Sequence, residues 1–192
     1  MHQSFSLNEK EKKECVALAR RAIKYFFETK ELLKPTAVSE KLKEKKSSFV
    51  TLMKNGRLRG CIGHLEANQP LYCDIIESAV SAAFQDPRFP PVEEEEFGNI
   101  KVEVSILTDP IEIAFSTSGE LLKKIVPEKD GLIIQKDCYS ATFLPSVWDE
   151  IKTKEEFLGH LCMKAGLGSD AWKEPGMKVL RYGTIKTLEK KT

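Results

Sequence analysis

The residues with the clearest chemical potential lie in one short stretch, Arg57-Leu58-Arg59-Gly60-Cys61-Ile62-Gly63-His64. In a regular strand, successive side chains alternate, so Arg59 and Cys61 would share a face. A guanidinium beside a thiol favours the thiolate, which is the reactive form of cysteine. Gly60 and Gly63 flank the cysteine, and glycines inside a strand often mark a bulge or the close approach of another backbone or a ligand. Cys61 is therefore a candidate nucleophile, and the alternative is a packed cysteine in a bent strand.

A metal site is a second hypothesis for the same stretch. Cys61-x-x-His64 could combine with His160-x-Cys162, because four nitrogen and sulfur ligands suit tetrahedral zinc. The two pairs are about a hundred residues apart in the sequence. His160 and Cys162 are also two positions apart on an expected helix, so they point to different sides of it. We therefore predict no metal site, and ordinary polar positions for both histidines.

A second charged segment, Asp86-Pro87-Arg88-Phe89, follows the cleanest helical stripe in the sequence. Arg88 could bind a carboxylate or a phosphate with its fork of donors. Alternatively, Asp86 and Arg88 could pair with each other and lock the helix exit. Further along the chain, Ser140 and Thr142 share one face of an expected strand, where two hydroxyls could line a cleft or complete a hydrogen-bond ladder.

Hydrophobic spacing and turn signals predict the elements that position these residues. A capping box at Ser6–Glu9 begins a helix that runs to about Thr29, and Pro70 opens a helix that Pro87 ends. Asn55-Gly56 is a strong hairpin signal between two short strands. The four glutamates Glu93–Glu96 are interpreted as a solvated face. Other expected elements are strands at 100–106, 111–115 (returning beside 100–106), 132–134, 140–144 and about 177–188, and helices near 121–125 and from 153.

This order of elements indicates the fold class. Consecutive hairpins imply antiparallel pairing, which predicts an α+β fold rather than a doubly wound sheet. Two hairpins, each followed by a helix, suggest a loose duplication of the architecture. A length of 192 residues without a low-complexity linker predicts a single domain over residues 1–192, with room for two lobes.

Composition excludes several functional classes. With 30 Lys and Arg against 29 Asp and Glu, the net charge is +1, so no strong field steers nucleic acids or anionic membranes. The longest apolar run has five residues, Cys15–Ala19, which is too short to span a bilayer. The first residues lack the apolar stretch of a signal peptide, so a cytoplasmic location is expected. Five cysteines without a C-x-x-C motif favour free thiols.

Several blocks of the sequence resemble the AMMECR family, in order and over roughly residues 8–188. The resemblance implies an α+β fold with a barrel-like, mainly antiparallel sheet from two similar β-then-α units, with packed helices. It implies no established reaction. Family members occur beside or fused to Memo-like proteins and radical S-adenosylmethionine proteins, which makes these the candidate partners. The blocks are Leu58–Gly63, Ala83–Pro91, Glu103–Leu107, Ala141–Pro145 and Leu161–Leu167.

The resemblance also implies a set of site residues. We expect a cysteine-centred enzyme or enzyme component, with Cys61 as the nucleophile or substrate-contacting thiol and Arg59 favouring its thiolate. Arg88 with Asp86 would hold an anionic substrate, and Thr142 would donate a hydrogen bond. The alternatives are a non-catalytic protein-interaction module, and RNA binding or modification through clustered arginines. No cofactor is expected. The family's signature residues in this sequence are Arg59, Gly60, Cys61, Gly63, Asp86, Arg88 and Thr142.

Overall fold

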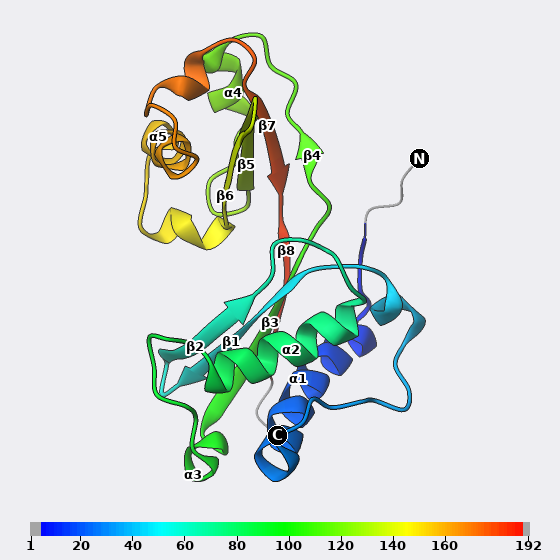
Figure 1. Ribbon diagram of the computed structural model, residues 1–192. Coiled ribbons are helices and arrows are strands. Elements are labelled where there is room, and N and C mark those ends of the chain that lie inside the picture. Colours follow the sequence, from blue (N-terminus) through cyan, green and yellow to red (C-terminus); the bar gives the residue numbers. More distant parts are fainter. Residues whose placement is uncertain (1–4, 190–192) are drawn as a thin grey trace. The chain divides into compact units, whose positions relative to one another are not determined.

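A computed structural model describes residues 5–189, whose elements form two compact units. The first unit contains the chain up to Leu107 and again from Ile185 onward, and the second unit is Thr108–Thr184. Each unit has its own four-stranded sheet (Figure 1), and each has its own hydrophobic core. The expected α+β class with antiparallel pairing is therefore confirmed. The strands of the described residues form two sheets, however, and not a closed barrel.

In the first unit, two long helices pack on one face of a sheet with strand order β2-β1-β3-β8. Helix α1 begins after Asn8, whose side chain accepts backbone hydrogen bonds while Glu11 reaches back, so the capping box is Asn8/Glu11 rather than Ser6/Glu9. The elements are α1 (Glu9–Thr29), η1 (Glu40–Lys43), β1 (Ser48–Lys54), β2 (Arg57–Gly63), α2 (Leu71–Phe84), α3 (Glu94–Phe97), β3 (Ile100–Leu107) and β8 (Thr184–Leu188).

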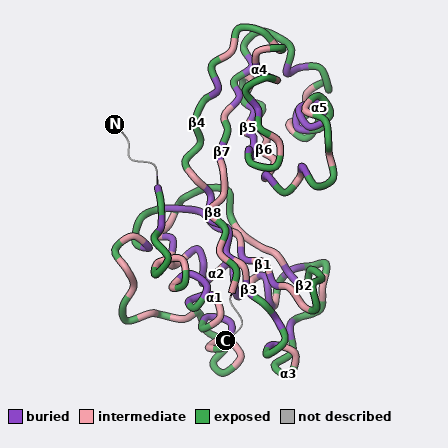
Figure 2. Tube along the Cα trace, turned by 180° about the vertical axis from the view of Figure 1, so that it is seen from behind, coloured by how far each residue is buried: buried purple, intermediate pink, exposed green. Residues whose placement is uncertain are grey.

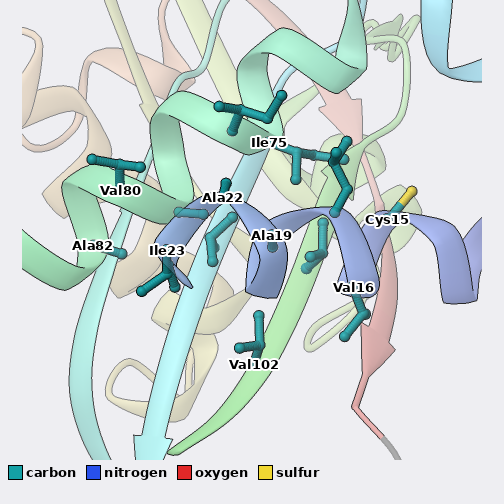
Figure 3. Packing of buried hydrophobic residues seen from close by; sticks show 14 of the residues in the cluster. Cys15, Val16, Ala19, Ala22, Ile23, Ile75, Val80, Ala82 and Val102 are labelled. Carbon is teal, nitrogen blue, oxygen red and sulfur yellow. The ribbon is translucent and has the colours of Figure 1, made fainter. Parts of the chain in front are cut away.

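The core of the first unit lies between these helices and the sheet. Small residues on α1, such as Ala19 and Ala22, are fully buried and let the helix approach α2 closely (Figure 3). Ile75 of α2 and Val102 of β3 are also fully buried in this layer. The helices therefore cover the sheet face on which Val102 lies. Side chains that alternate with the core residues along each strand point to the opposite, outer face.

The hairpin of β1 and β2 turns at Asn55-Gly56, as predicted. Both residues have positive φ, 53° and 78°, which is typical of a type I′ turn. Pairing begins with Lys54 opposite Arg57 and Met53 opposite Leu58, but the next pair is Leu52 opposite Gly60. Arg59 is therefore an extra residue on β2, and the hairpin contains a β-bulge.

The second unit has strand order β4-β7-β5-β6. Its core centres on Trp148 and Phe157, whose stacked rings have centroids 3.8 Å apart. Figure 2 shows buried residues on β5 and α5 here, and on α1, α2 and β1 in the first unit. The elements are β4 (Ile111–Glu112), α4 (Ser118–Lys124), β5 (Gly131–Lys136), β6 (Tyr139–Phe143), η2 (Pro145–Asp149), α5 (Lys154–Lys164), η3 (Ala171–Lys173) and β7 (Lys178–Tyr182).

Two expectations about the strands are wrong. The expected last strand is divided at Gly183 into β7 and β8, which belong to different sheets. The segment that begins at Ile111 does not return beside β3, because Ile111 is paired with Arg181 of β7. Both errors have one cause: local periodicity indicates a strand but does not specify its partner. Among residues 5–189, no helix has the length and apolar character needed to cross a membrane.

Candidate functional site

The bulge in β2 determines which way Cys61 points. Without an extra residue, the tight turn would pair Cys61 with Val50, whose side chain is buried in the core. With the bulge, Cys61 is opposite Thr51. The Cys61 Sγ atom lies 3.2 Å from Thr51 Oγ1 on the sheet face turned away from α1 and α2. One inserted residue thus moves the thiol from the core to the outer face, where Cys61 is half-buried.

Gly60 is required because α2 lies directly on β2 at this point. A Cβ atom at residue 60 would lie 2.1 Å from the carbonyl oxygen of Ala82. Gly63 is required for a different contact, since a Cβ there would be 2.2 Å from Ser48 O and 2.6 Å from the Phe49 ring. The two glycines therefore permit close packing, and Gly60 brings the C-terminal end of α2 next to Cys61.

Asp86 and Arg88, which follow α2, hold the backbone of Cys61. The strand β2 is at an edge of the sheet, so at Cys61 the backbone N–H and C=O point away from β1. The N–H donates to Asp86 Oδ2 at 2.8 Å, and the carbonyl accepts from Arg88 Nη2 at 3.1 Å. Arg88 also donates to both Asp86 oxygens, from Nε at 2.9 Å and Nη2 at 2.7 Å. We call Asp86, Arg88 and the Cys61 backbone the edge clamp.

Burial and charge make the edge clamp rigid. The Asp86 side chain is only 2% exposed, whereas that of Arg88 is 53% exposed. The hydrogen bond from Arg88 lowers the pKa of Asp86 far below its usual range, and the backbone N–H groups of Cys61 and Arg88 contribute. The pKa of Arg88 is raised, chiefly by its hydrogen bonds to Asp86. Arg88 thus contacts the backbone carbonyl of Cys61, and most of its positive charge is offset by Asp86.

Arg59 does not have the position expected from regular alternation. As the bulged residue, it donates to Glu96 Oε1 at 2.6 Å and to the carbonyl oxygens of Pro90 and Pro91 at 2.9 and 3.2 Å. No hydrogen bond within residues 5–189 joins Arg59 to Cys61. Glu96 was expected on a solvated face, but its side chain is 13% exposed and also binds Lys54. Arg59 therefore fastens the segment after α2 to β2, and its charge is neutralised there.

Two further candidate residues, Thr142 and Cys162, belong to the second unit. Thr142 is on β6 in the second unit, where its hydroxyl bonds to Leu132 O and to the Tyr182 hydroxyl, each at 2.9 Å. Cys162 is completely buried in the core of that unit, and burial raises the pKa of its thiol. In the described part of the chain, no group of three or more His, Cys, Asp or Glu is placed to hold a metal ion.

Two residues of the site, Thr51 and Glu103, are not indicated by any motif in the sequence. Thr51 contacts the thiol, and Glu103 of β3 is the cross-strand partner of Thr51. Cys61, Thr51 and Glu103 therefore form a row of thiol, hydroxyl and carboxylate across three adjacent strands of the outer face. The alternation of apolar and polar residues in β3 predicts that Glu103 lies on a polar face of the sheet. Cys61 lies beside Thr51 and Glu103 only because the bulge shifts the register of β2.

The sequence profile of the AMMECR1 family matches residues 16–187. The chain belongs to this family. It is 43% identical over 171 residues to Protein Mbar_A1807 of Methanosarcina barkeri, covering 86% of this chain and 84% of that protein. It is 44% identical over 178 residues to Protein PYRAB00100 of Pyrococcus abyssi, covering 87% and 84%. The crystal structure of Uncharacterized Protein PH0010 from Pyrococcus horikoshii is similar, with 36% identity, a TM-score of 0.80, and coverage of 96% of this chain and 98% of that chain.

In this AMMECR1 chain, most of the signature residues form one structure. Arg59, Gly60, Asp86 and Arg88 join β2 to the end of α2, and together they fix Cys61 at the sheet edge. Thr142 belongs to the other unit, where its hydrogen bonds hold β6 to β5 and β7. The arrangement can present a single thiol, at a fixed position, to a molecule on the outer face of the sheet.

Proposed function

We propose that this chain is a cysteine-centred enzyme or enzyme component in which the Cys61 thiol contacts the substrate. The supporting observation is the edge clamp: a buried carboxylate and its exposed arginine partner hold both backbone polar groups of Cys61, while the Cys61 side chain stays on the outer face. Thr51 Oγ1, 3.2 Å from the sulfur, could donate a hydrogen bond to a Cys61 anion, and the Arg88 guanidinium, held at the Cys61 carbonyl, is the nearest positive group of the edge clamp. Arg59 and Asp86 position the thiol rather than bind substrate.

The family resemblance extends this proposal to partners. We propose that the chain acts with Memo-like and radical S-adenosylmethionine proteins, so that its substrate is a product or precursor of their chemistry. Arg59 and Arg88 already bind carboxylates within the chain, which argues against an anionic substrate held by these two residues. The same pairing argues against RNA binding, which needs arginines free to contact phosphates.

Thiol labelling tests the proposal directly. The native chain is treated with iodoacetamide, and labelling of each cysteine is followed by peptide mass spectrometry. Cys138 is the internal standard, because it is an exposed thiol in the turn between β5 and β6. We expect Cys61 to react faster than Cys138 although it is less exposed, because its surroundings stabilise the attacking sulfur.

The matched variants are Arg88→Gln and Arg57→Gln. Arg57 is an exposed arginine on the same strand and lies outside the edge clamp. We expect Arg88→Gln to slow the labelling of Cys61 several-fold more than that of Cys138, and Arg57→Gln to change neither rate. If Cys61 reacts no faster than Cys138 in the native chain, the edge clamp is only structural, and the alternative of a non-catalytic interaction module is favoured.

A further inference from the structure

A buried carboxylate orients a histidine just beyond the end of β2. Asp74 lies in the first turn of α2, and its side chain is 1% exposed. Its Oδ1 atom is 2.8 Å from His64 Nδ1, and its Oδ2 atom accepts from Ser48 N at 2.7 Å and from Ser48 Oγ at 2.6 Å. Three donors therefore surround this carboxylate, and the imidazole is one of them.

This arrangement determines which ring nitrogen of His64 is free. Because Asp74 is an acceptor, Nδ1 carries the hydrogen, and the neutral ring has its lone pair on Nε2. The His64 side chain is 49% exposed, and within residues 5–189 no hydrogen bond engages Nε2. An imidazole held in this tautomer by a buried carboxylate has the geometry of a general base, since the carboxylate also stabilises the imidazolium that forms.

His64 is one of the residues that line an open cavity of about 650 Å³. The described residues that line the cavity include carboxylates and amides but neither Lys nor Arg. Such a lining suits a polar molecule that is neutral or positively charged, and it disfavours anions. The lining residues are Gly63, His64, Leu65, Glu66, Asn68, Gln69 and Asp74.

His64 is not the base that serves Cys61. Cys61 and Gly63 alternate with Ile62 along β2 and with His64, which directly follows the strand, and Ile62 packs against the core under α2. The His64 ring turns to the same side as Ile62, because its partner Asp74 belongs to α2. Cys61 instead contacts Thr51 on the outer face. The two groups therefore lie on opposite faces of the sheet.

We propose that His64 and Asp74 form a second reactive centre, in which His64 Nε2 removes a proton from water or a hydroxyl group that attacks a neutral or cationic polar substrate in the cavity. The proton passes to the imidazole as the attacking oxygen forms its new bond, and Asp74 stabilises the imidazolium. The proton then goes to the leaving group or to solvent. This centre is independent of the proposed role of Cys61.

The neutral ester p-nitrophenyl acetate is a suitable probe. In the expected step, water attacks the carbonyl carbon while His64 Nε2 takes its proton, and the bond from this carbon to the aryl oxygen breaks. The products are acetate and p-nitrophenolate, with two protons released to solvent. The parent protein for the test is Cys61→Ser, because this removes acyl transfer to the candidate thiol and so separates the two proposals.

In that parent, we expect His64→Gln to lower the hydrolysis rate about tenfold or more, and His160→Gln, at an exposed position on α5, to leave it unchanged. The glutamine side chain in His64→Gln retains an amide N–H that can donate to Asp74, so the fold should persist, and circular dichroism checks this. Asp74→Asn should also lower the rate. If it fails to fold, Ser48→Ala replaces it, because it removes the hydroxyl that donates to Asp74 Oδ2. An unchanged rate in folded His64→Gln would overturn the proposal.

Discussion

The edge strands β2 and β6 carry the candidate residues of the two units, and they are held in different ways. At Cys61 on β2, a buried carboxylate and its arginine partner bind both the N–H and the C=O that face away from the sheet. At Thr142 on β6, the carbonyl accepts one hydrogen bond, from Lys164 Nζ at 2.9 Å. Lys164 is exposed, and its ammonium also lies 5.0 Å from the Phe143 ring centroid.

This difference shows where the fold requires a fixed geometry. Removing a carboxylate such as Asp86 from water costs free energy unless hydrogen bonds and an opposite charge compensate for it. If one of these partners moved out of hydrogen-bond distance, part of this cost would no longer be compensated. A lysine at the surface has no such cost and tolerates movement. An edge strand needs only to be shielded from other strands, which a lysine achieves. The edge clamp therefore does more than shield: it fixes the position of one thiol.

The largest expected effect is that of Asp86→Ala. The substitution leaves the Cys61 N–H without its acceptor and Arg88 without its counter-charge, which we expect to lower the free energy of unfolding by about 2–4 kcal/mol. Urea unfolding measures this loss. Hydrogen exchange of the Cys61 amide should also accelerate, because this N–H loses the carboxylate that accepts its hydrogen bond.

Two variants test that interpretation. Asp86→Asn keeps one oxygen for the Cys61 N–H but loses the charge, so its effect should be intermediate. Asp149→Ala, at an exposed aspartate of the second unit, should change stability by less than about 0.5 kcal/mol. A loss at Asp86→Ala as small as that at Asp149→Ala would mean that the two edges are held equally loosely.

An acid titration gives the next largest effect, at Glu96. The hydrogen bond from Arg59 is the main reason that the pKa of Glu96 is lowered to about 2, and Lys54 adds to it while burial opposes it. The unfolded chain has an ordinary glutamate pKa of about 4.3. Because the folded pKa is the lower one, the stabilisation is fully present above about pH 5 and is lost as the pH falls towards 2.

We therefore expect Glu96→Gln to destabilise the chain by about 1–2 kcal/mol at neutral pH, and this difference from the unsubstituted chain to vanish near pH 2. Urea midpoints across this range provide the measurement. The matched control is Glu120→Gln in the second unit, where an ion pair with Lys124 also lowers the pKa but lies at the surface, so little change is expected. A Glu96→Gln difference that stays constant with pH would contradict the assignment.

Much of this architecture is predictable from local patterns. The periodicity of α1 and α2 and the Asn55-Gly56 turn depend on neighbouring residues only, and each is present in the structure. The α+β class and the AMMECR family membership follow from the same local information. Strand partners do not, which explains why the expected strand over residues 177–188 is two strands in two sheets.

The candidate site was only partly predictable because one residue changes its register. The glycine pattern around Cys61 indicated a bulge, but not that Arg59 would be the extra residue. With regular pairing, Arg59 and Cys61 would lie on the same face of β2, and Thr51 would be paired with Gly60. Because of the bulge, Arg59 instead binds Glu96, and Thr51 is paired with Cys61. The run of glutamates made Glu96 look solvent-exposed, because its half-buried partner, Arg59, is 37 residues away in the sequence. Contacts of this range have no local signal.

The smallest expected effect tests the other edge. Replacing Lys164 by Met keeps an apolar stem over Phe143 but removes the hydrogen bond to Thr142 O, and we expect a loss of less than about 0.5 kcal/mol, measured by urea unfolding. Thr142 should keep its place because its hydroxyl still bonds to Leu132 O and Tyr182. A loss as large as that of Asp86→Ala would show that a single exposed lysine fixes an edge as firmly as a buried carboxylate with its arginine partner. The edge clamp would then need no functional explanation.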